Sequence, residues 1–192
     1  MKSRDHLLSQ QEKEALLTFA RIAIEEALNA RQTKSIRFES KIFSEKRGAF
    51  VSLHQNGKLR GCIGYVLAYK PLIETVKEMA VAAARRDPRF SPVTPEELPE
   101  IDIEISVLSP LYEIKDINEI EIGRHGLYIK NGPHSGLLLP QVATDYKWDR
   151  ESFLQQTCRK AGLFSDAWQD EETTIQVFSA QVFGEKQSTS SC

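Results

Sequence analysis

The sequence has few cysteines and no long apolar run. Its three cysteines, Cys62, Cys158 and Cys192, are an odd number at wide spacing. This pattern does not form a disulfide framework and is typical of a reducing compartment, so we expect a cytoplasmic protein. No apolar stretch approaches the ~20 residues that span a bilayer, and the N-terminus lacks the apolar core of a secretory signal. The sequence therefore predicts no membrane contact.

A strong net charge is also missing, because the formal charge is only −2 for 192 residues. Such a balance creates no global field that attracts nucleic acid or an anionic membrane. The chain has no phosphate-binding P-loop and no dinucleotide-binding fingerprint. No Cys/His pair has metal-ligand spacing, and the four histidines stand alone. Neither a metal nor a cofactor is predicted.

Local patterns predict three long helices. Ser9 and Glu12 form a capping box, and apolar residues then recur at helical spacing up to Leu28. A second helix is predicted from Pro71 to about Arg86, where Asp87-Pro88 stops it. Thr94 and Glu97 form another capping box, so a short helix is predicted to follow them. Asp149 is typical of the cap of a third helix, which ends at Gly162.

Strand patterns lie between these helices. Residues 49–66 are predicted to form a β-hairpin around Asn56-Gly57, and residues 101–107 alternate apolar and polar side chains. Further strands are expected near 111–115, 120–122, 126–130 and 136–139, with a last one at 174–183, and a mobile polar loop is expected at 130–136. Because the strands form antiparallel-looking groups, we expect an α+β fold with a mostly antiparallel or mixed sheet flanked by helices.

The chain shows no internal repeat and no long linker. We therefore expect one domain over residues 1–183. The tail 184–192 is polar and serine-rich, and it is predicted to be disordered.

The segment Leu59–Gly64 is the strongest local candidate for a site. If the hairpin loop has two residues, Leu53 faces Arg60 and Val51 faces Cys62, so that these four share one face. An arginine beside a cysteine favours the thiolate, and the flanking Gly61 and Gly64 allow a ligand or another backbone to approach closely. The alternative is that Cys62 is a small buried hydrophobe and that the glycines only permit packing.

Other polar residues are weaker candidates, and each has an ordinary structural explanation. Asp87 and Arg89 either form a solvated pair at a helix end or point toward a cleft. Glu104 and Ser106 share the polar face of the strand at 101–107, which faces either solvent or a pocket. His134 lies in a polar loop, and Gln141 follows an apolar strand, where it is either a buried hydrogen-bond partner or a ligand contact. We expect Cys158 to be a core residue.

Taken together, these segments resemble the AMMECR-type domain family, named for the Alport syndrome, midface hypoplasia and elliptocytosis chromosomal region. The hallmark is Leu59-Arg60-Gly61-Cys62-Ile63-Gly64, and the similarity extends over roughly residues 10–183. It continues through Asp87–Phe90, Ile103–Ser109, Gly136–Ala143, Trp148, Phe153-Leu154, Cys158 and Lys160–Leu163. The compact chain is most similar to the prokaryotic branch called AmmeMemoRadiSam system protein A.

The resemblance implies an α+β fold with a larger and a smaller subdomain and a cleft near the hexapeptide. It also implies Memo-like and radical-SAM partner proteins, but it supplies no reaction. One hypothesis is the catalytic or substrate-binding part of a modification system, with Cys62 as nucleophile and Glu104 or Asp87 as acid or base.

The second hypothesis is a non-catalytic adaptor that contacts an unknown small-molecule or macromolecular ligand. In that case Arg60 and Arg89 contact an acidic group of the ligand or partner, and Cys62 only packs. The candidates for substrate or partner binding under either hypothesis are Arg60, Gly61, Gly64, Arg89, Ser106, His134 and Gln141. Nucleic-acid binding ranks last, because no basic stripe with interleaved aromatic residues is present. The sequence leaves open whether the protein is an enzyme.

Overall fold

The computed structural model describes residues 7–29 and 40–186, and the chain divides into two compact units. Unit 1 comprises Ser109–Ala180, and unit 2 comprises the described residues on either side of it. The second boundary falls inside strand β7 (Thr174–Gly184), which therefore contributes to both. Both units combine helices with antiparallel strand pairs, which confirms the predicted α+β class. None of the described helices is long and apolar enough to cross a membrane.

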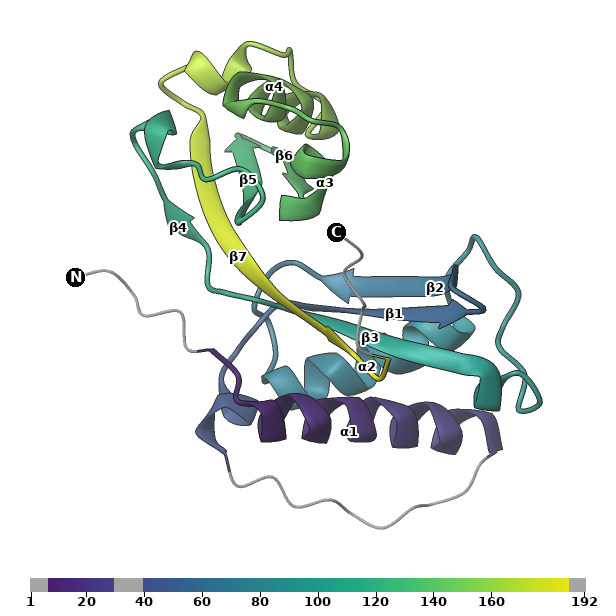
Figure 1. Ribbon diagram of the computed structural model, residues 1–192. Helices are drawn as coiled ribbons and strands as arrows, with labels where there is room; N and C mark the ends of the chain where they lie inside the picture. Colours follow the sequence, from purple (N-terminus) through teal and green to yellow (C-terminus); the bar gives the residue numbers. More distant parts are fainter. Residues whose placement is uncertain (1–6, 30–39, 187–192) are drawn as a thin grey trace. The chain divides into compact units, whose positions relative to one another are not determined.

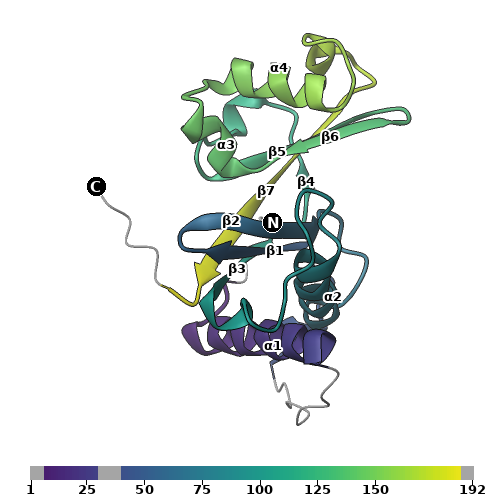
Figure 2. The same cartoon turned by 90° about the vertical axis from the view of Figure 1, so that its right-hand side faces the viewer.

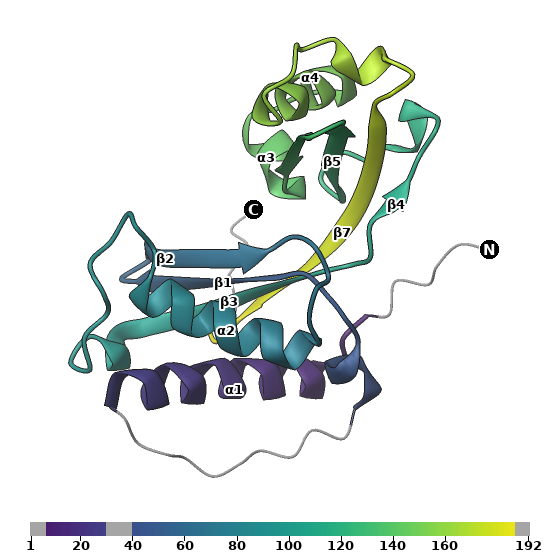
Figure 3. The same cartoon turned by 180° about the vertical axis from the view of Figure 1, so that it is seen from behind.

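Unit 2 is a sheet with two helices along one of its faces. Its strands are β1 (Ala49–Gln55), β2 (Lys58–Tyr65), β3 (Ile101–Leu108) and the end of β7, in the order β2-β1-β3-β7. Helices α1 (Gln10–Asn29) and α2 (Leu72–Arg85) cover the same face of this sheet (Figures 1 and 3). Short 3-10 turns lie at η1 (Lys41–Ser44) and η2 (Leu98–Glu100).

The first two helices form where the sequence places them. Ser9 N–H donates to Glu12 Oε2 at 2.7 Å, and Glu12 N–H donates to Ser9 Oγ at 3.3 Å, so the predicted capping box is confirmed. Helix α2 starts directly after Pro71 and ends at Arg85, within one residue of the prediction.

Alternate side chains of the sheet supply the core of unit 2. Val51, Leu53, Ile103 and Ile105 are fully buried against the helices, and the predicted alternation of residues 101–107 is confirmed. Removal of such side chains from water is the main term that holds the sheet to α1 and α2. The opposite face of the same strands carries polar side chains: Ser52, His54, Asp102, Glu104 and Ser106.

The hairpin turn is confirmed, but the register of its second strand is not as predicted. Asn56 and Gly57 adopt φ of 52° and 75°, as a type I′ turn requires. A β-bulge then shifts the pairing, so that Leu53 lies opposite Gly61 and Ser52 lies opposite Cys62. The extra residue reverses the side-chain faces of everything beyond it. The predicted placement of Cys62 beside Val51 and Leu53 is therefore wrong.

Unit 1 pairs its strands with two further helices. Strands β4 (Tyr112–Glu113) and β5 (His125–Asn131) both pair with β7, and β6 (His134–Leu138) pairs with β5. Helix α4 (Arg150–Lys160) packs along β5 and β6, after the short helix α3 (Pro140–Asp145) (Figure 2). The remaining turns are η3 (Ile117–Glu119) and η4 (Ala167–Gln169).

Helix α4 confirms two predictions in unit 1. Asp149 caps it by accepting a hydrogen bond from Ser152 N–H at 2.8 Å, and Gly162 follows its end with φ of 77°. Cys158 is fully buried in the core with Phe153, as expected. Burial raises the pKa of the Cys158 thiol, so this cysteine is chemically protected.

Several local predictions in unit 1 are wrong. The segment expected to be a polar loop is a tight hairpin, because Gly132 takes φ of 54° and lets β5 turn directly into β6. Residues 120–122 form no strand, since the chain turns there to bring Arg124 N–H and His125 N–H onto the Glu121 carbonyl. Helix α3 was not predicted.

The prediction of a disordered tail is also wrong for residues 184–186. Gly184 ends β7, and Glu185 accepts hydrogen bonds from the Arg21 guanidinium and from Ile103 N–H at 2.9 Å. Lys186 forms an ion pair with Asp102. These contacts anchor the segment, which composition could not reveal. The rest of the tail, 187–192, lies outside the described residues.

Candidate functional site

Two segments far apart in the sequence meet at the backbone of Cys62 in unit 2. Cys62 lies in the edge strand β2, and its N–H donates to Asp87 Oδ2 at 2.8 Å. Its carbonyl accepts a hydrogen bond from Arg89 Nη2 at 3.2 Å. Both polar atoms of one edge residue are thus satisfied by the turn after α2, which holds Cys62 in place as a neighbouring strand would.

Asp87 and Arg89 are also bound to each other. Arg89 donates from Nε to Asp87 Oδ1 at 2.9 Å and from Nη2 to Oδ2 at 2.7 Å. The Arg89 guanidinium, and then the N–H groups of Cys62 and Arg89, hold the pKa of Asp87 well below its usual range despite burial. The same pairing raises the pKa of Arg89. Asp87 is therefore an ionised clamp at neutral pH.

Arg60, at the bulge of β2, is bound in a similar way. Its Nε donates to Glu97 Oε1 at 3.0 Å, and Nη2 donates to Oε2 at 3.1 Å. Nη1 donates to the Ser91 carbonyl at 2.9 Å. Glu97 in turn accepts a hydrogen bond from Thr94 N–H at 2.8 Å. The carboxylate of the predicted Thr94/Glu97 capping box therefore also binds Arg60. Arg60, followed by Thr94, lowers the pKa of Glu97. Arg60 thus fastens residues 91–97 to β2.

The Cys62 side chain lies on the polar face of the sheet. Ser52 pairs with Cys62 on one side and with Glu104 on the other, so Cys62, Ser52 and Glu104 form a row across three strands. Ser52 Oγ donates to Cys62 Sγ at 3.2 Å. Cys62 and Glu104 are half-buried, and the Glu104 carboxylate has no bonded partner among the residues that the structure describes.

The next row supports this one. Phe50 pairs with both Gly64 and Ser106, which places all three on the same face as Cys62. A Cβ at Gly64 would lie less than 3.0 Å from the Phe50 ring, so the glycine leaves room for the aromatic side chain beside the thiol. The arrangement places a thiol, a hydroxyl and a carboxylate in reach of one bound molecule, next to an aromatic wall.

Relatives of known sequence and structure match nearly the whole chain. Residues 17–183 match the AMMECR1 family. The chain belongs to that family. It is 47% identical over 187 residues to a protein of Methanothermobacter thermautotrophicus, covering 93% of this chain and 96% of the relative. Over 189 residues it is 44% identical to a protein of Methanocaldococcus jannaschii, covering 93% and 92% of the two chains.

The fold is also that of a solved relative. The crystal structure of an uncharacterized protein from Pyrococcus horikoshii superposes with a TM-score of 0.82 at 39% identity, over 94% of each chain. The AMMECR1 fold, and the α+β class with it, is therefore shared with an experimentally determined structure.

In this AMMECR1-family chain, Gly61 serves packing rather than ligand approach. It lies on the helix-facing side of β2, where a Cβ would lie less than 3.0 Å from the Ala83 carbonyl oxygen of α2. The close backbone approach expected at this glycine is thus made by a helix. Gly61 also directly follows the bulged residue of β2. A glycine inside a strand can indicate such a bulge from sequence alone.

The last two candidates belong to unit 1. His134 is exposed at the start of β6, and its Nδ1 lies near Gly162. Gln141 is exposed in the first turn of α3, where its carbonyl accepts a hydrogen bond from Thr144 Oγ1 at 2.7 Å. Among the described residues, no hydrogen bond joins His134 to Gln141. They are not part of the row around Cys62 within unit 2.

Sequence reasoning missed Ser52, Phe50 and Glu97 as members of the site. Ser52 and Phe50 become neighbours of Cys62 and Gly64 only once the bulge is placed. Glu97 was identified as a capping residue but not as the partner of Arg60. Within the described part of the chain, no group of three or more His, Cys, Asp or Glu side chains could hold a metal ion.

Proposed function

We propose that this AMMECR1-family protein is a cysteine-dependent enzyme whose active site is the row Cys62–Ser52–Glu104. The observation that carries the proposal is the hydrogen bond from Ser52 to a half-buried thiol whose backbone is held on both sides by Asp87 and Arg89. Cys158 provides the contrast, because that cysteine is fully buried among apolar side chains. Cys62 instead lies on a polar face, positioned by residues that a packing cysteine does not need.

The row suggests a role for each residue. Cys62 is the nucleophile, since the thiolate is the reactive form of cysteine, and the Ser52 hydroxyl stabilises that thiolate by donating to it. Glu104 lies two strands away, about 10 Å, because neighbouring strands are about 4.8 Å apart. That spacing leaves room for a substrate group between sulfur and carboxylate. Glu104 is therefore the acid or base that acts on the substrate.

The clamp residues receive a different role from the one that sequence alone suggested. Asp87 uses both carboxylate oxygens for Arg89 and Cys62, so it is proposed as a positioning residue in place of an acid or base. Arg89 and Arg60 position β2 in the same way. Memo-like and radical-SAM proteins remain the proposed partners of a modification system that contains this enzyme.

Alkylation rates test the thiol. In a Cys192→Ser background, iodoacetamide at pH 7 followed by peptide mass spectrometry should modify Cys62 faster than the same cysteine in urea-unfolded protein, while Cys158 stays protected. Loss of the Ser52 hydrogen bond, worth about 1 kcal/mol, should slow Cys62 about fivefold in Ser52→Ala. Ser106→Ala, on the same face but without a contact to sulfur, is the matched control. If Cys62 is alkylated at the same rate in folded and unfolded protein, and a strain carrying Cys62→Ser keeps its function, then Cys62 is not a nucleophile.

A non-catalytic adaptor is the competing function, and one observation favours it. The Arg89 side chain is 54% exposed although it is paired with Asp87, so it presents positive charge at the edge of β2. An acidic partner surface could bind there. Co-purification with the Memo-like and radical-SAM proteins separates the two functions. If the protein is an enzyme, Cys62→Ser should abolish cellular function but leave the partners bound. If it is an adaptor, Cys62→Ser should leave function intact, and the double variant Arg60→Ala/Arg89→Ala should lose the partners.

A further inference from the structure

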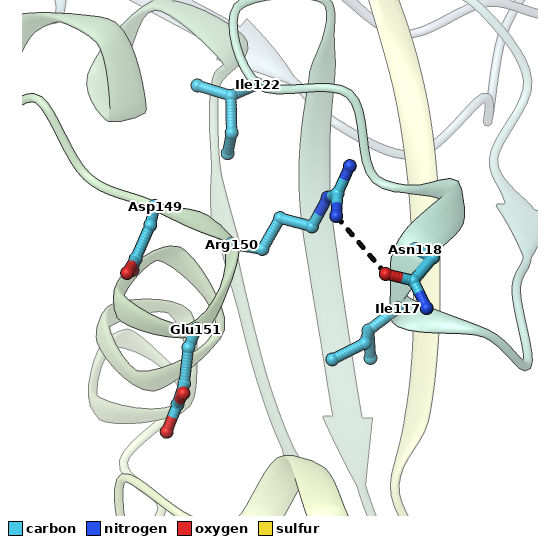
Figure 4. A pocket seen from close by; sticks show the side chains of 6 residues that line it. All are labelled: Ile117, Asn118, Ile122, Asp149, Arg150 and Glu151. Atoms are coloured by element: carbon cyan, nitrogen blue, oxygen red, sulfur yellow. Dashed lines mark hydrogen bonds between the residues drawn. The ribbon is translucent and has the colours of Figure 1, made fainter.

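Unit 1 contains a pocket of about 480 Å³ that the proposed function does not use. It lies between the first turn of α4 and the loop that holds η3, and Figure 4 shows the six residues around it. Asp149 and Glu151 line the α4 side, and Ile117 and Asn118 line the opposite side (Figure 4). This volume falls in the range of about 300–1,000 Å³ that is usual for small-molecule sites.

The walls of this pocket are largely aliphatic. Ile117 and Ile122 contribute two branched side chains, and Ile122 remains 36% exposed. The Arg150 side chain crosses between them and reaches Asn118 (Figure 4). Its Nε donates to the Ile120 carbonyl at 2.7 Å, and Nη1 donates to Asn118 Oδ1 at 3.2 Å. The guanidinium is therefore anchored to the protein, while its hydrocarbon stem adds to the apolar wall.

The charge at this pocket is negative, because two carboxylates, those of Asp149 and Glu151, line it together with the single guanidinium of Arg150. Asp149 accepts from Ser152 N–H and Glu151 accepts from Gln155, so neither carboxylate has a basic partner among the residues described. Hydrogen bonds from Ser152 also lower the pKa of Asp149, which keeps it ionised. Unit 1 as a whole has eleven acidic and seven basic residues over Ser109–Ala180. A cation is attracted to such a surface, and an anion is repelled.

Aliphatic walls and unneutralised carboxylates select for one kind of molecule. We propose that the pocket binds a small organic amine, with its alkyl chain against Ile117, Ile122 and the Arg150 stem and its ammonium group at Asp149 and Glu151. The site is separate from Cys62 in chemistry and in residues. If the pocket does not bind amines, the proposed enzyme function is unaffected. If Cys62 is not a nucleophile, the proposed amine site is unaffected.

Three probes of equal chain length test this site on the full-length protein. Hexylamine, hexanoate and 1-hexanol are titrated while amide chemical shifts are followed by NMR. Hexylamine should shift residues 117–122 and 149–152, bind more tightly than 1-hexanol, and weaken in high salt, because exposed charge interactions are screened. Hexanoate should bind least.

Charge-removing variants sharpen the test. Asn caps helices as well as Asp does, so Asp149→Asn removes the charge and keeps α4 capped. Asp149→Asn and Glu151→Gln should each raise the Kd for hexylamine about two- to fivefold, as expected for exposed charge pairs. Glu171→Gln, which removes the same charge away from the lining, should not. Ile122→Ser should weaken both hexylamine and 1-hexanol.

Three results would overturn the proposal. Hexanoate binding as tightly as hexylamine would make this an anion site at Arg150. Equal binding of hexylamine and 1-hexanol, unaffected by Glu151→Gln, would remove the role of the carboxylates. Absence of localised shifts with any probe at tens of millimolar would mean that the pocket is not a binding site.

Discussion

Replacing Gly61 with alanine should destabilise unit 2 by about 3 kcal/mol, because overpacking against a backbone atom cannot be relieved by a side-chain rotation. A Cβ at this position would lie less than 3.0 Å from the Ala83 carbonyl oxygen, so β2 and α2 would have to separate. That movement would also disturb Asp87, which follows α2 and holds Cys62. Urea unfolding should show the loss, and alkylation of Cys62 should change with it.

Gly57→Ala is the matched control for this substitution. Gly57 has φ of 75° in the hairpin turn, but no atom lies within 4 Å of a Cβ built there. Only backbone strain opposes alanine at this position, at a cost of about 1 kcal/mol. If both substitutions cost the same, the contact with α2 is not what requires glycine at position 61.

Asp87→Ala should cost about 2–3 kcal/mol, the second large effect expected in unit 2. The substitution leaves Cys62 N–H without its acceptor at the strand edge and separates Arg89 from its buried partner. Because Arg89 is half exposed, water can solvate its charge, and this keeps the cost below that of a fully buried pair. Asp87→Asn keeps an acceptor at this position and should cost less.

The pH dependence of the same pair has a definite sign. The folded pKa of Asp87 is lowered, so its stabilising contribution is present above the unfolded value of about 3.9 and is lost as pH falls below it. The difference in free energy of unfolding between wild type and Asp87→Asn should stay constant from pH 7 to pH 5 and shrink below pH 4. Urea unfolding at pH 7, 5 and 3 measures it. A gap that remains unchanged at pH 3 would contradict an ionic clamp.

The fold was predictable wherever its signals are local. The Ser9/Glu12 box, the Asp149 cap and the Asn56-Gly57 turn all act through neighbouring backbone groups, and each is confirmed. The alternation of residues 101–107 was equally readable, since a strand with one buried face repeats every two residues. The hairpin at Gly132 was missed, because the flanking polar residues mask its turn signal.

The register around Cys62 could not be predicted with the same certainty. One extra residue at the bulge changes which side chains share a face, and the bulge is stabilised by α2 and by the partners of Arg60 rather than by local sequence. Placing Cys62 beside Val51 followed from a regular ladder. Its true neighbours, Ser52 and Glu104, appear only when the ladder shifts by one.

The segment around Cys62 was recognisable by itself, as a glycine-flanked Arg60/Cys62 pair within a motif of the AMMECR1 family. The sequence alone determined the three long helices, the Asn56-Gly57 turn and the identity of most candidate residues, because these depend on short-range geometry and residue type. Only the tertiary structure decided that Asp87 and Arg89 hold the Cys62 backbone and that its thiol meets Ser52. Those contacts join segments 10 to 27 residues apart, and packing sets their geometry.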